Sequence, residues 1–467
     1  MSIEKGGVTQ SVSAKESRNI YATLTIFFAC LGSITYGYCS AIISSTLASP
    51  AFLSTMKLLT ATNSTQLSGT IQALFQVGAL FGGLMSGLTS DPLGRRTAIF
   101  IACVLVIIGS ALQTGSTHVA MFIVARFITG MGIGNLVIIV PTWQSEVSNP
   151  HSRGLLVGMH GTFILIGYSL ALWIGTAFSY VPNGDTQWRV PLALQVVPPL
   201  LLASGIYAIP ESPRWLLQHG KEEAALHVCK KLRKNKNDPN DDFAIAEFAG
   251  IKAQWEYDRE LDSTWLAIFR VKSYRRRAFI GFSALFLAQC TGTQVINNYG
   301  PSIYEMIGYG PKAQLFLSCG WISSGILSNF ISALLMDKVG RVNMIRFGFA
   351  GTLVALIGTT VTLAIGTRTE LWPNHLRGKG AAISVSGLFV GALIVLTAAS
   401  TAFAQIQWKY YIVFTVMTTI GVIISFLYFP DVNGMSLEEA ARAFGDHVEE
   451  LENVFNSLSD VEPIKDD

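Results

Sequence analysis

Apolar residues along this chain fall into repeated runs of about twenty, the length that an α-helix needs to cross the hydrocarbon core of a bilayer. Charged or turn-forming residues bound each run. Eleven runs are present, at roughly 20–43, 67–89, 97–115, 119–141, 155–178, 189–209, 278–306, 313–336, 344–366, 380–404 and 409–430. The pattern predicts an all-α polytopic membrane protein embedded in a lipid bilayer.

The composition agrees with this interpretation and excludes several other classes. Half of the 467 residues are hydrophobic and 13% are charged, and the net charge of +3 is too small to favour nucleic-acid binding. The six cysteines are scattered without the spacing of a disulfide or metal framework. We find no phosphate loop, metal-spaced His or Cys, or nucleophile with a base, so the sequence predicts neither an enzyme nor a cofactor.

The distribution of basic residues predicts the orientation. Residues 1–19 form a polar tail with no signal-peptide cleavage site. We therefore expect the first span to stay in the protein as a membrane anchor, with the N-terminus in the cytosol. Lys and Arg concentrate after even-numbered spans, as the positive-inside rule requires. They are most concentrated in 211–277, where acids offset them, so we expect a helical cytosolic linker there. Residues 431–467 form an acidic tail, also expected to be cytosolic.

The two halves of the chain repeat one design, which divides it into bundles at 20–210 and 278–430. The turn after the second span reads DPLGRR from Asp91, and the turn after the eighth reads DKVGR from Asp337. Each half then has a Glu followed seven residues later by an Arg and a Gly, and each ends its last span at a Pro and an acid. Parallel repeats of this kind build two-lobed transporters with a central site.

The repeat also indicates a missing helix. Asp91 and Glu146 are about 55 residues apart, whereas Asp337 and Glu370 are only about 33 apart. The shortfall of about 22 residues equals one transmembrane helix of roughly 33 Å. The repeat therefore predicts that the tenth of twelve spans has been lost near Thr367, which would place the next basic loop on the wrong side of the membrane. Either the gene structure behind the sequence is incorrect, or the protein has eleven spans and doubtful activity.

These motifs resemble those of the sugar porters of the major facilitator superfamily, fungal type. The resemblance rests on DPLGRR at 91–96, RFITGMGIG at 126–134 with PTWQSE at 141–146, RG at 153–154, PESPRW at 210–215 and LRGKG at 376–380. It implies the major facilitator fold of two pseudo-symmetric helical bundles, a plasma-membrane location, and transport of a sugar or similar polyhydroxylated solute by alternating access. The oligomeric state stays open.

Charges at the predicted cytosolic helix ends can pair across the gap between bundles and act as a releasable inner lock. Ordinary interfacial charges obeying the positive-inside rule are the alternative. The lock residues of the first half are Asp91, Arg95, Arg96, Glu146, Arg153, Glu211 and Arg214. Those of the second half are Asp337, Arg341, Glu370 and Arg377.

The seventh span carries the densest polar cluster and is the predicted solute site. Buried amides offer the donors and acceptors that a hydroxyl-rich ligand needs, and neighbouring Gly and Pro residues predict a bent or broken helix. An interhelical hydrogen-bond seam is the alternative. The resemblance aligns this span with the family's substrate motif, although other contact positions depart from the family pattern and leave the solute open. The candidate residues are Gln289, Gln294, Asn297, Asn298 and Tyr299.

The coupling mechanism depends on the first and fourth spans. Arg126 lies within an apolar run, where a charge normally faces a partner or a wet cavity. Proton-coupled relatives resemble FGYD in the first span, but this chain has YGYC ending at Cys39. The missing carboxylate favours facilitated diffusion over proton symport. His160 is the nearby titratable residue, and a hydrogen-bonded packing role is the simpler interpretation.

Two alternatives to transport remain at this stage. A sugar sensor would share the fold and bind without transporting, although the tail at 431–467 is short for such a receptor. An inactive product of a truncated gene is the second alternative. Polyols, quinate and inositol compete with sugars as the solute.

Overall fold

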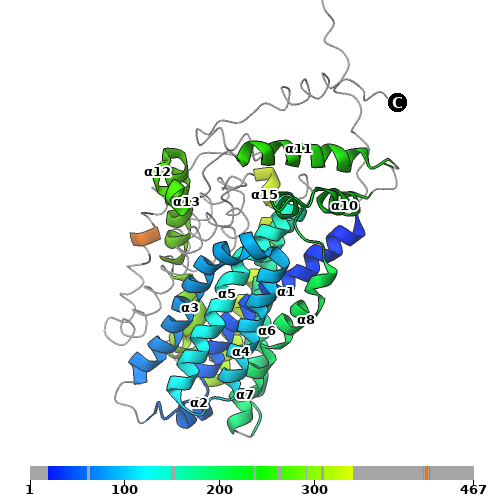
Figure 1. Cartoon of the computed structure of the whole chain (residues 1–467). Coiled ribbons are helices and arrows are strands. Elements are labelled where there is room, and N and C mark those ends of the chain that lie inside the picture. The colour runs from blue at the N-terminus through cyan, green and yellow to red at the C-terminus, as the bar shows by residue number, and fades with distance from the viewer. Residues whose placement is uncertain are drawn as a thin grey trace, which may run out of the picture.

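A computed structural model describes residues 19–59, 64–148, 153–182, 184–234, 238, 240–259, 264–290, 292–306 and 310–339, with 414, 416–418 and 420. The first half is a bundle of long helices (Figure 1). These are α1 (Ile20–Leu47), α3 (Ser64–Leu93), α4 (Arg95–Thr114), α5 (Val119–Val147), α6 (Arg153–Phe178), α7 (Gly184–Leu194) and α8 (Val197–Gly205), with the short α2 (Pro50–Thr55) and η2 (Ile206–Ala208).

The sixth predicted span is divided into α7 and α8 because of its prolines. Pro198 and Pro199 occupy the first turn of α8. A proline has no N–H to donate to the preceding turn, so the helix ends before it and a new helix begins. The interruption leaves Gln195 between the two helices, and its buried amide group has no hydrogen-bond partner among the described residues.

Four shorter helices follow the first bundle: α9 (Pro213–Gln218), α10 (Glu222–Arg233), α11 (Asp242–Asp258) and α12 (Trp265–Arg270). All four lie within 211–277, the segment predicted to be a helical linker. Helices α10 and α11 lie across one end of the bundle, opposite the end that holds α2 (Figure 1). Arg233 fixes α10 to the bundle, because its guanidinium donates to the carbonyls of Val147 and Ser148 at the end of α5 and pairs with Glu247 of α11.

The second half begins with α13 (Lys272–Cys290), α14 (Thr293–Met306) and α15 (Pro311–Val339). The seventh predicted span is indeed broken, between α13 and α14, where Gly292 has a φ of +82°. A Cβ there would lie 2.6 Å from the ring of Phe414. The predicted spans 344–366 and 380–404, the position of the missing span, and the two tails up to 18 and from 431 lie outside the described residues. Of the span 409–430, the structure describes only 414, 416–418 and 420.

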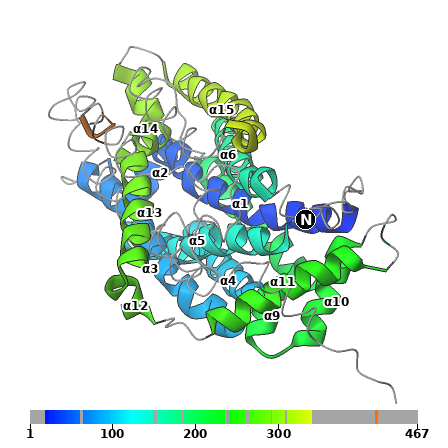
Figure 2. The same cartoon turned by 90° about the horizontal axis from the view of Figure 1, so that it is seen from above.

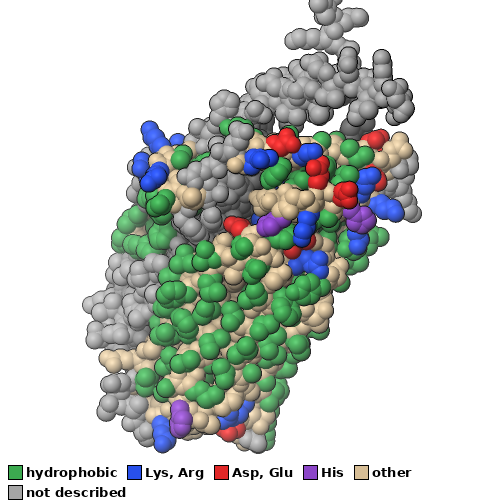
Figure 3. Space-filling view, viewed as in Figure 1, with side chains coloured by type: hydrophobic (Ala, Val, Ile, Leu, Met, Phe, Trp, Pro, Cys, Tyr) green, Lys and Arg blue, Asp and Glu red, His purple; other side chains and the backbone are tan. Residues whose placement is uncertain are grey.

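Seven helical stretches in the described part are long and apolar enough to cross a membrane. They are Ile20–Leu47, Gln66–Leu93, Arg95–Thr114, Val119–Val147, Leu155–Phe178, Gly184–Ala208 and Pro311–Leu334. They correspond to predicted spans one to six and eight. A hydrophobic band covers the middle of the face in Figure 3, and charged side chains gather towards its ends. This distribution is what a bilayer-spanning bundle requires.

Glycines allow α3 and α5 to pack with their backbones in close contact. Gly82 would place a Cβ 1.9 Å from the carbonyl oxygen of Met131, and Gly134 would place one 1.9 Å from that of Ala79. Gly78 and Gly130 make equivalent contacts with the opposite backbone. The glycines spaced four apart in the sequence therefore serve packing, because only a residue without a side chain lets the two backbones meet this closely.

Candidate functional site

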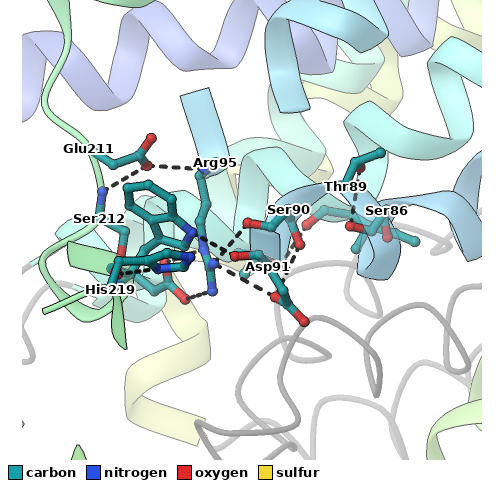
Figure 4. A network of polar contacts seen from close by, with 12 residues as sticks. Ser86, Thr89, Ser90, Asp91, Arg95, Glu211, Ser212 and His219 are labelled. Atoms are coloured by element: carbon teal, nitrogen blue, oxygen red, sulfur yellow. Dashed lines mark hydrogen bonds and ion pairs between the residues drawn. The ribbon is translucent and has the colours of Figure 1, made fainter. Parts of the chain in front are cut away.

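A buried ion pair forms the centre of a charge cluster at the end of the bundle next to the linker helices. The guanidinium of Arg95 donates through Nε and Nη2 to the two carboxylate oxygens of Glu146, each at 3.1 Å. The two side chains are 3% and 2% exposed. Asp91 lies 3.7 Å from Nη1 of Arg95, and the carbonyl of Ser90 accepts from the same nitrogen at 3.1 Å. The guanidinium is therefore held in one orientation (Figure 4).

Glu211, which follows the first bundle in the sequence, caps the N-terminus of α4. Its carboxylate accepts from the backbone N–H groups of Arg95 at 3.1 Å and Arg96 at 3.2 Å, and from Ser212 at 2.9 Å. Gly94 precedes the helix with a φ of +90°, and a Cβ there would lie 2.7 Å from the Glu211 carboxylate. A negative group stabilises this positive helix end, yet burial dominates and raises the pKa of Glu211 above its ordinary value, against these hydrogen bonds.

Tryptophans join the same segment to two other helices. Nε1 of Trp215 donates to the carbonyl of Asp91 at 2.8 Å, and its ring stacks on His219. Nε1 of Trp143 donates to the carbonyl of Pro210 at 3.1 Å. The segment from 210 to 219, which includes α9, is thus bound to α3, α4 and α5 together.

The structure brings together four of the predicted lock residues of the first half: Asp91, Arg95, Glu146 and Glu211 (Figure 4). Arg96 contributes its backbone, while its side chain donates to the carbonyl of Tyr207 and lies over that ring. Within the described residues, no hydrogen bond or ion pair joins Arg214 to the cluster. The side chains of Arg153 and Asp337 lie outside the described set, as do the whole of Arg341, Glu370 and Arg377.

The polar residues of the seventh span flank the break between α13 and α14. Gln289 is 1% exposed, and neither its amide oxygen nor its amide nitrogen has a hydrogen-bond partner in the described part of the chain. Asn298 donates to the backbone and side-chain oxygens of Gln294 at 2.9 and 3.4 Å. Asn297 accepts from the indole of Trp321 at 3.4 Å. Tyr299 lies in α14, but its side chain is outside the described set.

Helix α6 connects this cluster to the first bundle. The hydroxyl of Tyr168 donates to the amide oxygen of Gln294 at 3.3 Å. Further along the same helix, Thr162 donates to Asn329 of α15 at 2.9 Å, and Ser169 and Ser323 share a hydrogen bond at 3.0 Å. A row of short polar side chains therefore runs along the contact between α6 and α15, which lie side by side in Figure 2.

Arg126 is 1% exposed and enclosed by α1 and α3. Its Nη1 donates to the backbone carbonyl of Cys39 at 3.0 Å, and the guanidinium lies 4.0 Å from the ring centroid of Phe75. Cys39 is itself buried beside it. His160 lies apart from this group, with Nδ1 2.6 Å from the hydroxyl of Ser33. That contact agrees with the hydrogen-bonded packing role expected for the histidine.

Sequence reasoning missed Tyr168, Thr162 and Asn329. The spacing of His160 and Tyr168, two helical turns apart, was the available signal for one polar face of α6. No motif marked the residues of α15 that meet this face.

Comparisons with known proteins agree with this architecture. The family model described as "Sugar (and other) transporter" matches residues 25–369 and 367–444. MFS-type transporter criB of Aspergillus cristatus is 32% identical over 450 residues, covering 89% of this chain and 92% of the relative. High-affinity glucose transporter 1 of Candida albicans is 26% identical over 431 residues, covering 82% of this chain and 79% of the relative.

The fold is shared with solved structures of the xylose transporter XylE. The proton:xylose symporter bound to 6-bromo-6-deoxy-D-glucose superimposes with a TM-score of 0.78 at 22% identity, covering 91% of this chain and 99% of that structure. The partially occluded inward open form from E. coli gives a TM-score of 0.71 at 20% identity, covering 90% of this chain and 100% of that structure. The chain thus belongs to the sugar transporter family of the major facilitator superfamily, as a multi-pass membrane transporter and not an enzyme.

Proposed function

We propose that the protein moves a sugar or similar small polyhydroxylated solute across the plasma membrane by alternating access. The main support for a polar solute site is the side-chain amide of Gln289, which is buried and has no hydrogen-bond partner in the described residues. An unpaired buried amide is costly unless a ligand completes it. The hydrogen-bonded Gln294 and Asn298 lie on the adjoining helix and offer further donors and acceptors for hydroxyl groups. Asn297 and Tyr299 complete the proposed contacts, and the glucose transporter and xylose symporter among the similar proteins support a sugar.

Facilitated diffusion is the proposed mode of transport. A proton-coupled carrier needs a group in the membrane that takes up and releases a proton during the cycle. In this chain a thiol, Cys39, lies next to Arg126, and no ion pair joins a carboxylate to that arginine among the described residues. The solved structure of a proton symporter shares the fold. This chain, however, has Cys39 where the motif of proton-coupled relatives has an aspartate.

The charge cluster around Arg95 and Glu146 is proposed as the first-half part of a releasable inner lock on the cytosolic side, with the N-terminus also cytosolic. The buried geometry supports this role over that of ordinary interfacial charges, which stay solvated. Asp337, Arg341, Glu370 and Arg377 are the proposed counterparts in the second half.

A local loss near Thr367 is part of the proposal. The family model matches in two segments that meet at residues 367–369, where the repeat spacing indicates the missing span. The alignment with criB also extends over 450 residues although it covers only 89% of this 467-residue chain, so the relative carries residues that this chain lacks. Sequencing the native transcript across Thr367 and Arg368 distinguishes an incorrect gene structure from a true eleven-span protein.

Transport is tested with the purified full chain in liposomes by counterflow of labelled D-glucose and D-xylose, with and without a pH gradient. Gln289→Ala is expected to reduce saturable uptake by about tenfold or more, because a buried polar site loses its partner. Gln66→Ala, at an exposed position of α3, is the matched control. Binding without counterflow would replace transport by the sensor function, and neither binding nor counterflow would leave an inactive protein. Uptake driven by the pH gradient would contradict facilitated diffusion.

A further inference from the structure

Helix α12, the last helix before α13, turns an apolar face to the outside of the protein. Leu266 and Phe269 lie three residues apart, on one side of the helix, and are 61% and 60% exposed. Ala267 and Ile268 of the same helix are buried. Large apolar side chains that are exposed at the end of a membrane-spanning bundle can enter the boundary between headgroups and acyl chains. The outer face of α12 therefore fits a membrane surface.

A cluster of four basic residues lies beside this apolar face and continues onto α13. All four side chains are exposed, and none of them takes part in an ion pair in the described part of the chain. The nearest acids in the sequence on either side are Asp262 and Glu305. Lys and Arg side chains gather in Figure 3 where Figure 1 places α12 and α13, next to hydrophobic side chains. The members of the cluster are Arg270, Lys272, Arg275 and Arg276.

Helix α13 sets the depth of this basic cluster. Positions 272, 275, 276 and 279 follow the spacing that places residues on one side of a helix. Phe279 is 54% exposed, and the rings of Phe282 and Phe286 stack further along the helix. Three residues of α-helix rise about 4.5 Å, so the apolar surface begins only this far beyond Arg276. The charges therefore lie at the level of lipid headgroups if the apolar surface lies in the hydrocarbon.

We propose that the basic cluster and the apolar face of α12 form a binding site for an anionic phospholipid of the cytosolic leaflet. Guanidinium groups bind phosphate oxygens through paired hydrogen bonds, and juxtamembrane clusters of Lys and Arg attract anionic lipids. Leu266 and Phe269 contact the acyl chains, which favours a lipid over a soluble phosphate compound that could not use them. The positive-inside rule alone accounts for the charges but not for the exposed apolar face beside them.

The site goes beyond transport of the solute and does not depend on which solute is carried. Helix α13 begins in the basic cluster and ends beside Gln289 of the proposed solute site. A bound lipid would thus hold the cytosolic end of the helix that carries Gln289.

The test is native mass spectrometry of the purified full chain in detergent, titrated with phosphatidylserine or with phosphatidylcholine of the same acyl chains. We expect phosphatidylserine to bind at least about tenfold more tightly, since each basic residue near an anionic surface contributes about fivefold. Arg275→Gln with Arg276→Gln should remove most of this preference. Lys221→Gln with Lys234→Gln, at exposed positions on the two ends of α10, is the matched control and should keep it. Leu266→Ser with Phe269→Ser should weaken both lipids, because it removes apolar contact and no charge.

Equal binding of the two lipids by the native chain would overturn the inference without needing any variant. Equal losses in the Arg275–Arg276 variant and in the α10 control would also overturn it, because the positive charge would then act diffusely. Glycerophosphoserine, the headgroup without acyl chains, should not displace the lipid at equal concentration. Displacement by this compound would assign the site to a soluble anion instead. Each of these failures leaves the proposed transport standing, because solute counterflow measures it separately.

Discussion

Removing one member of the Arg95–Glu146 pair should cost far more than removing both. Glu146→Leu leaves a guanidinium buried at 3% exposure, and such an uncompensated charge costs about 3–5 kcal/mol. The lower end applies here, because Asp91 stays 3.7 Å away and the carbonyl of Ser90 still accepts from Nη1. The double variant Arg95→Met with Glu146→Leu should stay within about 1–2 kcal/mol of the native protein, because both charges are gone and the backbone of residue 95 still binds Glu211.

The single variants should also differ in their pH dependence. Arg95→Met leaves a carboxyl group that can take up a proton, so its cost should shrink between pH 7 and pH 5, whereas the cost of Glu146→Leu should not change because arginine stays charged. The assay is reversible unfolding in mixed SDS and maltoside micelles, followed by circular dichroism. The exposed pair of Lys252 and Glu222, joined at 2.6 Å, is the control, and Lys252→Ala should cost less than about 1 kcal/mol.

A cost below about 1 kcal/mol for Glu146→Leu would contradict a buried ion pair, because the guanidinium would then be solvated or otherwise compensated. A double variant that loses as much stability as the two single variants together would contradict it as well. Additive losses would mean that the two side chains act independently, which contradicts the two hydrogen bonds between them.

Three further predictions concern other parts of the described structure. Burial raises the pKa of Glu211 in the folded state. The contribution of this residue to stability should therefore be complete below its ordinary pKa near 4.5 and fall as the pH rises through its pKa in the folded state. Glu211→Gln should remove this pH dependence from the free energy of unfolding measured between pH 4 and 7. Gly82→Ala should cost about 3 kcal/mol in the same unfolding assay, since its Cβ would lie 1.9 Å from the oxygen of Met131, whereas Gly320→Ala, with open space around it, should be tolerated. Burial raises the pKa of Cys229 to about 12, so this thiol, 3% exposed, should resist maleimide at pH 7 until the protein is unfolded, and rapid labelling of the folded chain would contradict the structure.

The spans could be predicted from sequence because lipid imposes one rule along each helix, independent of its neighbours. The break after α13 was also predictable, since Gly292 can adopt a positive φ that other residues avoid. The pairing of Thr162 with Asn329 could not be predicted, because it depends on the rotation and register of two helices far apart in the sequence. For the same reason the repeat placed Arg95, Arg96 and Glu146 at one end of the bundle without showing that Arg96 turns away towards Tyr207.

The polar contacts between α6 and α15 are hydrogen bonds whose partners can be exchanged. Serine and threonine hydroxyls both donate and accept and rotate freely, so a partner such as Ser323, which serves both Ser169 and Trp173, can be exchanged without leaving a group unpaired. The glycine-mediated contact between α3 and α5 has no such freedom, because the two backbones interlock. The contact between α6 and α15 can therefore change its hydrogen-bond partners more easily than the contact between α3 and α5 can change its packing.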